Sequence, residues 1–241
     1  MDEWSLIAIT CGMLFMASFT RSTIGFGDSL LAMPVLVHFL GLKTASPIVA
    51  LTASTIGISI LRTRWKEVEF GAVKRLIISS MIGIPIGVWG IRNIPEHYVK
   101  GALGVVLMAF GLYSIFKPKG PKIGGNTSAD IAGFLAGILG GAYNLNGGPI
   151  AIYGSLAQWN QQKFVATMQG YFLPTGLFIV IGHGVGGLWS QKVFTLFGYA
   201  FLLILLGVYL GGKLNKYIKP GTFDLFVYIY MVIMGGCLLL F

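Results

Sequence analysis

Apolar residues run along this chain in long blocks that short polar or glycine-rich stretches separate. Several blocks reach the roughly 20 residues that a helix needs to cross a bilayer, so the pattern predicts an all-α polytopic membrane protein. The first, second, sixth and seventh blocks are short or interrupted by Gly and Pro, which leaves open ten spans or eight spans with two re-entrant hairpins. The ten blocks cover residues 4–20, 24–42, 45–62, 70–91, 99–116, 128–143, 147–158, 164–182, 191–212 and 221–241.

The longest polar linker lies near the middle of the chain and divides the blocks into five and five. It reads KPKGPKIGGNTS, with the Pro, Gly and Lys that are typical of a flexible connection. We therefore predict a first membrane repeat over 1–116, a cytoplasmic linker over 117–127 and a second membrane repeat over 128–241. A shift of 121 positions keeps the block lengths and breaks of the two halves in register. Because each half has an odd number of blocks, the repeats are predicted to be inverted relative to each other.

Composition and charge support the membrane class and suggest a topology. The chain is 55% hydrophobic and 10% charged, whereas soluble domains contain about 25% charged residues. The net charge of +9 comes from residues between apolar blocks, which favours topology over nucleic-acid binding. Basic residues cluster at 62–75, in the central linker and at 213–219, and the positive-inside rule places these regions in the cytoplasm. The N-terminus, the 183–190 loop and the C-terminus then lie outside a multi-pass inner or plasma membrane.

Two polar, glycine-rich breaks occupy equivalent positions in the halves. The first reads RSTIGFGDS from Arg21 to Ser29, and the second reads GGAYNLNGGP from Gly140 to Pro149. Helix ends at such breaks present free N–H groups and a partial positive charge that favour anions, and inverted-repeat transporters place them at the bilayer midplane. Asp28 or Ser29 can cap the helix after the first break, and Pro149 suits the first helical position after the second. In the alternative interpretation, the glycines only permit close helix packing.

The candidate substrate ligands come from both breaks and from two polar residues beyond them. Arg21 can bind an anion through a bidentate hydrogen bond; alternatively it is an anchor at the cytoplasmic surface or the partner of Asp28. Asp28 is the candidate for a coupling proton, with an ion-paired helix cap as the alternative. Tyr153 and Gln169 can line the path or join helices. The predicted substrate-binding residues are Arg21, Ser22, Thr23, Gly25, Gly27, Asn144, Asn146, Gly147, Gly148, Tyr153 and Gln169.

Motifs for metal binding or catalysis are missing from the sequence. It contains no HExxH motif, carboxylate cluster, GxSxG elbow or Walker motif. We therefore expect no metal, no cofactor and no enzymatic activity, with a membrane-embedded enzyme, a scaffold subunit and a channel as the alternatives. The expected partners are a small anionic substrate and the lipid bilayer, and no nucleic acid; a homodimer is one assembly open to such a chain.

Three stretches resemble the signature regions of the TauE/SafE family: GFGDSLLAMPVL in the first half, and GFLAGILGGAYNLNGGPIAIY and KFVAT in the second. The resemblance covers nearly the whole chain and implies an anion transporter, since these proteins are usually described as exporters of sulfite, sulfoacetate and related sulfur-containing anions. Export of sulfite or an organosulfonate by alternating access, with the anion held at the two broken-helix ends, is the first expectation. Proton- or cation-coupled uptake of a thiosulfate-like anion is the alternative. The chain departs from the family pattern at Asp28, Asn144 and Asn146, where glycine is common, and these departures concern the substrate rather than the fold.

Overall fold

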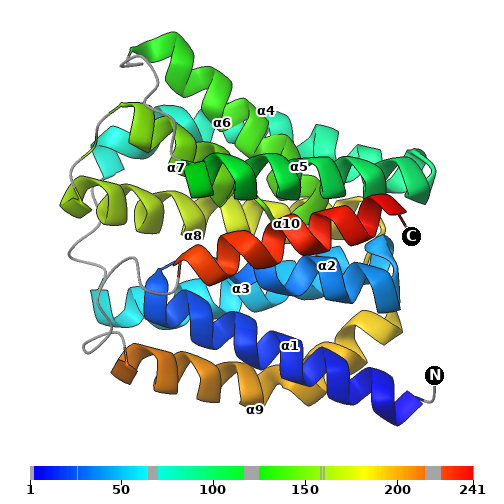
Figure 1. The fold of residues 1–241 in the computed structure, drawn as a ribbon. Coiled ribbons are helices and arrows are strands. Elements are labelled where there is room, and N and C mark those ends of the chain that lie inside the picture. Colours follow the sequence, from blue (N-terminus) through cyan, green and yellow to red (C-terminus); the bar gives the residue numbers. More distant parts are fainter. Residues whose placement is uncertain are drawn as a thin grey trace.

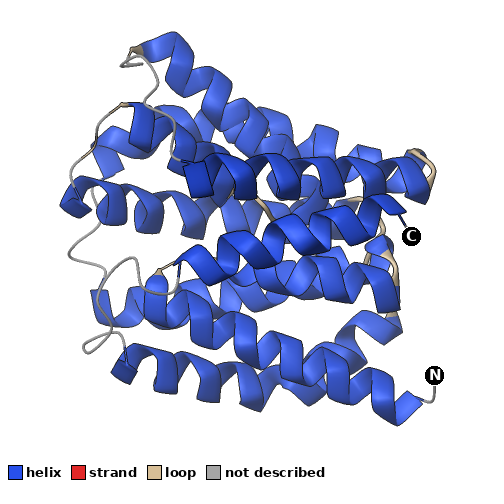
Figure 2. Cartoon of the chain, in the orientation of Figure 1, coloured by secondary structure: helices blue, strands red, loops and turns tan. Residues whose placement is uncertain are grey.

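The computed structural model describes residues 3–25, 27–64, 70–116, 125–157, 159, 161–214 and 224–240. Within these ranges the protein has ten α-helices and no strands (Figure 1; Figure 2), which confirms the all-α prediction. The helices are α1 (Glu3–Ile24), α2 (Asp28–Leu40), α3 (Leu42–Arg64), α4 (Phe70–Asn93), α5 (Glu96–Phe116), α6 (Asn126–Tyr143), α7 (Gly147–Leu156), α8 (Gln161–Val185), α9 (Gln191–Leu214) and α10 (Asp224–Leu240).

Each predicted apolar block forms one helix, but the predicted helix caps at both breaks are wrong. The residue that caps α2 is Gly27, without a side-chain cap hydrogen bond, because the backbone there has a positive φ that glycine adopts without strain. Asp28 therefore becomes the first residue of α2, and its carboxylate binds Arg21 instead of the helix end. Helix α7 begins at Gly147, so Pro149 is its third residue. Proline is tolerated there because backbone N–H groups in the first turn have no partner within the helix.

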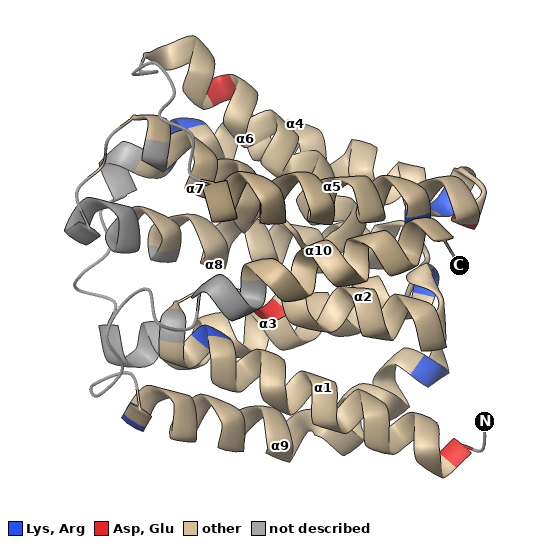
Figure 3. Cartoon of the chain, viewed as in Figure 1, with Lys and Arg blue, Asp and Glu red and all other residues tan. Residues whose placement is uncertain are grey.

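The helices have the length and the surface of a polytopic membrane protein. Among the described residues, four helical stretches are long and apolar enough to cross a membrane: Glu3–Thr23, Val73–Asn93, Glu96–Phe116 and Gln191–Leu214. Large apolar side chains such as Trp89 and Leu202 are exposed on the outside of the bundle, which in water would be a costly surface. Charged residues lie mostly near the two ends of the bundle (Figure 3).

The helices form two groups that meet along α3 and α8. Helices α1, α2, α3 and α9 pack together, as do α4, α6, α7 and α8, and the paired helices α5 and α10 lie against both groups (Figure 1). Helix α1 packs on α9 as its counterpart α6 packs on α4, so each group combines three helices of one half with one helix of the other. If the two halves are equivalent, α1 corresponds to α6 and α9 corresponds to α4, so the two contacts are the same contact made once by each half. The inverted relationship between the halves stays a prediction.

Glycine residues allow the backbones of the closest helix pairs, α4 with α6 and α1 with α9, to approach each other. A Cβ atom added to Gly137 or Gly141 of α6 would collide with backbone oxygen atoms of α4. One added to Gly211 of α9 would collide with the Phe19 carbonyl of α1, and one added to Gly207 with the Ser18 hydroxyl. The close-packing interpretation is therefore correct for Gly141, which belongs to the second break.

The described helix ends fit the predicted topology. In Figure 1, the beginning of α1, the end of α10 and the connection from α8 to α9 lie at one end of the bundle. The ends of α3, α5 and α9 lie at the opposite end, next to the basic regions in the sequence. Most of the central linker lies outside the described residues, and which end faces the cytoplasm stays a prediction.

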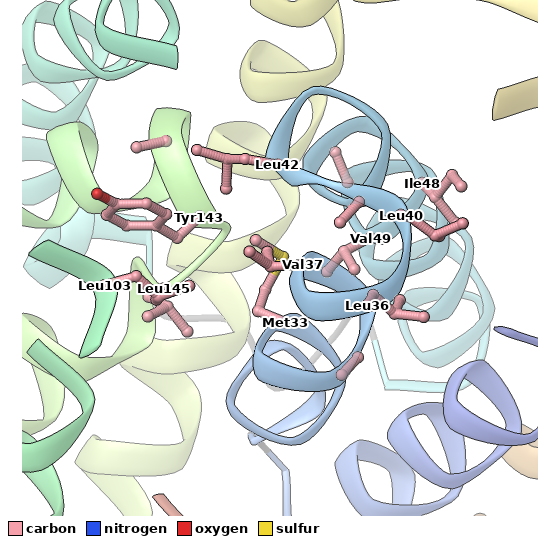
Figure 4. Close-up of a cluster of buried hydrophobic side chains, with 14 of the residues drawn as sticks. Met33, Leu36, Val37, Leu40, Leu42, Ile48, Val49, Leu103, Tyr143 and Leu145 are labelled. Carbon is pink, nitrogen blue, oxygen red and sulfur yellow. The ribbon is translucent and has the colours of Figure 1, made fainter. Parts of the chain in front are cut away.

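An apolar core surrounds α2 and brings the two breaks toward the same interior. Met33, Leu36 and Val37 of α2 are fully buried, and Figure 4 shows Met33 and Val37 facing Leu103 of α5 and Leu145 beyond α6. Since Leu145 belongs to the second break, this core connects the helix that follows the first break with the second break itself.

Candidate anion site between the two helix breaks

Two glycines reverse the chain at the first break. Gly25 and Gly27 have φ values of 100° and 99°, in the left-handed region where a side chain would strain the backbone. The Gly25 N–H donates to the Arg21 carbonyl at 2.7 Å, which closes the last turn of α1. As a result, the last turn of α1 and the first turn of α2 lie side by side, with Arg21 facing Asp28.

Arg21 and Asp28 form a buried ion pair. The distance from Arg21 Nη1 to Asp28 Oδ2 is 2.8 Å, and the two side chains are only 4% and 11% exposed. Of the alternatives for Arg21, partnership with Asp28 is therefore confirmed, and the anchor at the cytoplasmic surface is wrong because the guanidinium is buried. Burial of a charged pair without further hydrogen-bond partners would be costly. The other contacts of the guanidinium therefore contribute to the stability of the buried pair.

The guanidinium of Arg21 also contacts α3 and α8. Its Nη1 donates to the Ala53 carbonyl of α3 at 3.3 Å, and its carbon lies 4.8 Å from the ring centroid of Phe172 of α8, a cation–π distance. The Nε–H is buried and has no hydrogen-bond partner among the described residues. A charged donor in the interior is thus available to an anion.

At the second break, Asn144 and Asn146 face different neighbours. Asn144 adopts the left-handed conformation with φ of 58° and ends α6. Its Nδ2 donates to the Ser46 carbonyl of α3 at 2.8 Å. Ser46 lies about 10 Å along α3 from Ala53, so the structure does not bring Asn144 together with Arg21. Asn146 instead donates from Nδ2 to Thr175 Oγ1 of α8 at 3.2 Å.

Phe172 contacts both breaks. One face of its ring lies against Arg21, and a Cβ atom added to Gly147 would be 3.0 Å from its Cζ. The ends of both broken helices therefore meet at one aromatic side chain near the middle of α8. Phe172 was not among the predicted site residues, because an aromatic residue in an apolar helix gives no distinctive sequence signal.

Ser54 of α3 is a second residue that the sequence analysis missed. Its hydroxyl is buried without a hydrogen-bond partner among the described residues, and it lies 3.6 Å from where a Cβ atom of Gly176 would be. Ser54 and Thr175 stand 121 positions apart, the same shift that relates the two halves. Polar residues at matched positions of two apolar helices are a signal that could have identified Ser54.

The family of the chain follows from its match to a sequence model. Residues 10–238 match the family described as Sulfite exporter TauE/SafE, so the match includes both breaks and the helices that surround them. The chain belongs to the TauE/SafE family. It is therefore a multi-pass membrane protein of a family of transporters for sulfite and related anions. Comparisons with curated proteins and with solved structures gave no match.

Several predicted ligands of this TauE/SafE protein lie away from Arg21. Thr23 Oγ1 donates to the Phe19 carbonyl at 2.7 Å and approaches the Gly211 carbonyl of α9 at 3.4 Å. Ser22 also faces Gly211, and its hydroxyl has no partner among the described residues. These two side chains thus lie against α9.

The remaining predicted ligands are dispersed. Gly148 adjoins the ring of Phe110 in α5, with 3.5 Å from its Cβ position to the ring. Tyr153 packs edge-on against Trp159 at a centroid distance of 5.4 Å. The side chain of Gln169 lies outside the described residues.

The side chains around the two breaks have the chemistry that suits an anion. No group of three or more His, Cys, Asp or Glu side chains comes together in the part of the chain that the structure describes. The polar groups on and around the two breaks are a guanidinium, amides and hydroxyl groups, and these are donors that recognise oxyanions.

Proposed function

We propose that this protein is a secondary transporter that holds a small sulfur-containing anion at Arg21, between the two helix breaks. Sulfite or an organosulfonate such as sulfoacetate is the substrate class that fits best, and the membership of the TauE/SafE family supports it. The main structural support is the buried Nε–H of Arg21, which has no partner among the described residues. A buried charged donor without a partner is costly, and a bound oxyanion would remove that cost.

The other donors of the proposed site come from α3 and from the second break. Ser54 of α3 offers a hydroxyl group without a described partner, and Asn146 offers an amide group that now bonds to Thr175. A sulfonate or sulfite head has three oxygen atoms, which can accept from Arg21, Ser54 and Asn146 together. Phe172 would then lie beside the anion and keep water away from the guanidinium.

Alternating access is the proposed mechanism. The two helix groups meet along α3 and α8, and the proposed ligands lie along that same boundary. Rocking of one group against the other would open the site to each side in turn. With the basic regions in the cytoplasm, an inside-negative potential favours export of an anion that crosses alone, by about 2.3 kcal/mol per charge per 100 mV.

Flux measurements with purified protein in liposomes test the proposal. The panel comprises sulfite, sulfoacetate, isethionate, taurine and thiosulfate, and we expect saturable flux of at least one anion. The same anion should raise the thermal unfolding temperature, because a ligand that binds only the folded state stabilises it. Absence of saturable flux for every member of the panel would contradict the proposal, and a flux that rises without saturation would favour a channel.

A further inference from the structure

We infer that Asp28 is an internal anion that the substrate displaces from Arg21, and that Asp28 takes up a proton when this happens, so that anion and proton cross the membrane together. The inference rests on the proposed function and adds its coupling ion. The resting site already has an anion in place, since the Asp28 carboxylate accepts from Arg21 Nη1 at 2.8 Å in a buried position.

The charge balance of the buried site leads to the proton. Arg21 and Asp28 together are neutral, so the empty transporter can change between its two orientations without an unpaired buried charge. A substrate anion beside an intact pair would leave one net negative charge in the interior, which is unfavourable. When Asp28 is protonated, the positive Arg21 and the bound anion again sum to zero. No bond between heavy atoms forms or breaks; one proton binds to the Asp28 carboxylate when the anion binds and leaves with it on the other side.

Among the residues that the structure describes, no charged group close to Asp28 other than Arg21 compensates for a bound anion. Helix α2 is packed against α1, α3, α5 and α10. From α1 the facing group is Arg21, whose Nη1 also donates to the Ala53 carbonyl of α3. From α10, the Tyr230 hydroxyl donates to the Leu31 carbonyl of α2 at 2.9 Å; the side chain of Asp224 lies outside the described residues.

The remaining titratable groups around α2 lie at its other end. Glu96 of α5 accepts from the Leu42 N–H and pairs with Lys100, and His38 is exposed near the end of α2. His38 is ten residues from Asp28, which is about 15 Å along the helix. Within the described residues, Arg21 is thus the counter-ion of Asp28, and a change in that pairing is the event that can take up a proton.

The geometry explains how an anion can replace the carboxylate. Arg21 uses Nη1 for Asp28 and for Ala53, while Nε is unoccupied in the described structure. An incoming oxyanion can bind Nε together with Nη2, because these two N–H groups lie on the same edge of the guanidinium. Its negative charge then competes with the Asp28 carboxylate for the positive charge of Arg21. Substrate binding and proton uptake are then linked, so each must strengthen the other.

The test compares the wild-type protein with Asp28→Asn in liposomes. Isethionate and sulfite serve as parallel probes, with a pH-sensitive dye inside the liposomes and the membrane potential set by a potassium gradient with valinomycin. For the wild-type protein we expect protons to move with the anion, faster influx at lower external pH, and little effect of the potential. The concentration of isethionate for half-maximal flux should increase as the external pH is raised, by up to tenfold per pH unit.

Asp28→Asn removes the competing anion and the proton acceptor at once. We expect half-maximal flux at a concentration at least tenfold lower than the wild-type value at alkaline pH, no proton movement, and a rate that now responds to the potential. Asp130→Asn is the matched control, because Asp130 forms an ion pair with Arg75 at 2.9 Å on the exposed surface; its flux should equal the wild-type flux. Asp28→Glu, which keeps a carboxylate, should retain proton movement.

The outcomes separate the inference from the proposed function. If the wild-type protein transports neither the two probes nor any other anion of the panel, the proposed function fails. If it transports an anion without proton movement and at a rate set by the membrane potential, the inference is wrong, whether or not Asp28→Asn folds. Wild-type pH dependence in a folded Asp28→Asn protein would likewise overturn the inference.

Discussion

A buried arginine in a membrane protein needs a compensating charge. For Arg21 this charge is the carboxylate of Asp28, seven residues later. The sequence predicted this pair as one alternative, because two opposite charges flanked the same glycine-rich turn. The contact with Phe172 could not be predicted, since it joins residues that are far apart in the chain. Local sequence therefore indicates the charged pair, whereas the aromatic side chain beside it depends on how α8 packs.

Arg21→Lys tests whether the guanidinium shape is needed in addition to its charge. Lysine can keep a positive charge near Asp28, but it has no Nε donor and no planar group to stack on Phe172. We expect the initial rate of anion flux in liposomes to fall at least tenfold while the protein still folds, as judged by its thermal unfolding. Wild-type flux in Arg21→Lys would show that a simple positive charge is sufficient.

The two asparagines of the second break should respond differently to replacement by alanine. In Asn146→Ala the hydrogen bond to Thr175 is lost, but Thr175 Oγ1 still donates to the Tyr171 carbonyl at 2.6 Å. We therefore expect lower flux with little change in the unfolding temperature. Asn144→Ala places alanine in a left-handed conformation and removes the bond to Ser46, which should cost about 2–3 kcal/mol of stability. Thermal unfolding measured beside flux distinguishes the two effects, and equal loss of stability in both variants would contradict this assignment.

At the scale of the elements, the apolar blocks predicted every helix because helix length and hydropathy are local properties. The caps were predicted less well: Gly27 rather than Asp28 precedes α2, since the positive φ at the turn and the ion pair with Arg21 outweigh side-chain capping. Which helices pair could not be read from the pattern. The contact of α6 with α4 depends on a row of small residues that matches the backbone of a distant segment.

Gly137→Ala and Gly148→Ala form a matched pair that tests this packing. A Cβ atom on Gly137 would collide with the Ser80 carbonyl of α4, whereas the Cβ position of Gly148 lies 3.5 Å from the Phe110 ring, at an ordinary contact distance. We expect Gly137→Ala to lose about 1–3 kcal/mol of stability and Gly148→Ala to unfold at the wild-type temperature. The measurement is thermal unfolding in detergent; equal unfolding temperatures for the two variants would show that α4 and α6 can separate without cost.

For the whole molecule, the boundary between α3 and α8 is where the proposed motion must occur. Ser54 Oγ lies 3.6 Å from the Cβ position of Gly176, so the two positions adjoin, and cysteines placed there are candidates for a disulfide. In a background without Cys11 and Cys237, the double variant Ser54→Cys and Gly176→Cys should lose flux on oxidation and regain it on reduction. The two single-cysteine proteins are the controls, and their flux should not respond to oxidation. Undiminished flux through the oxidised double variant would show that the groups do not move against each other at this level.

The position of Asp28 so soon after Arg21 also has a consequence for how the chain enters the bilayer. Both residues belong to the first two helices, so they leave the ribosome almost together, long before α8 is synthesised. An unpaired arginine inside the membrane is costly, and a carboxylate in the adjoining helix can offset that cost during insertion itself. The amino-terminal hairpin thus brings its own counter-ion into the membrane, before the helices that complete the site exist.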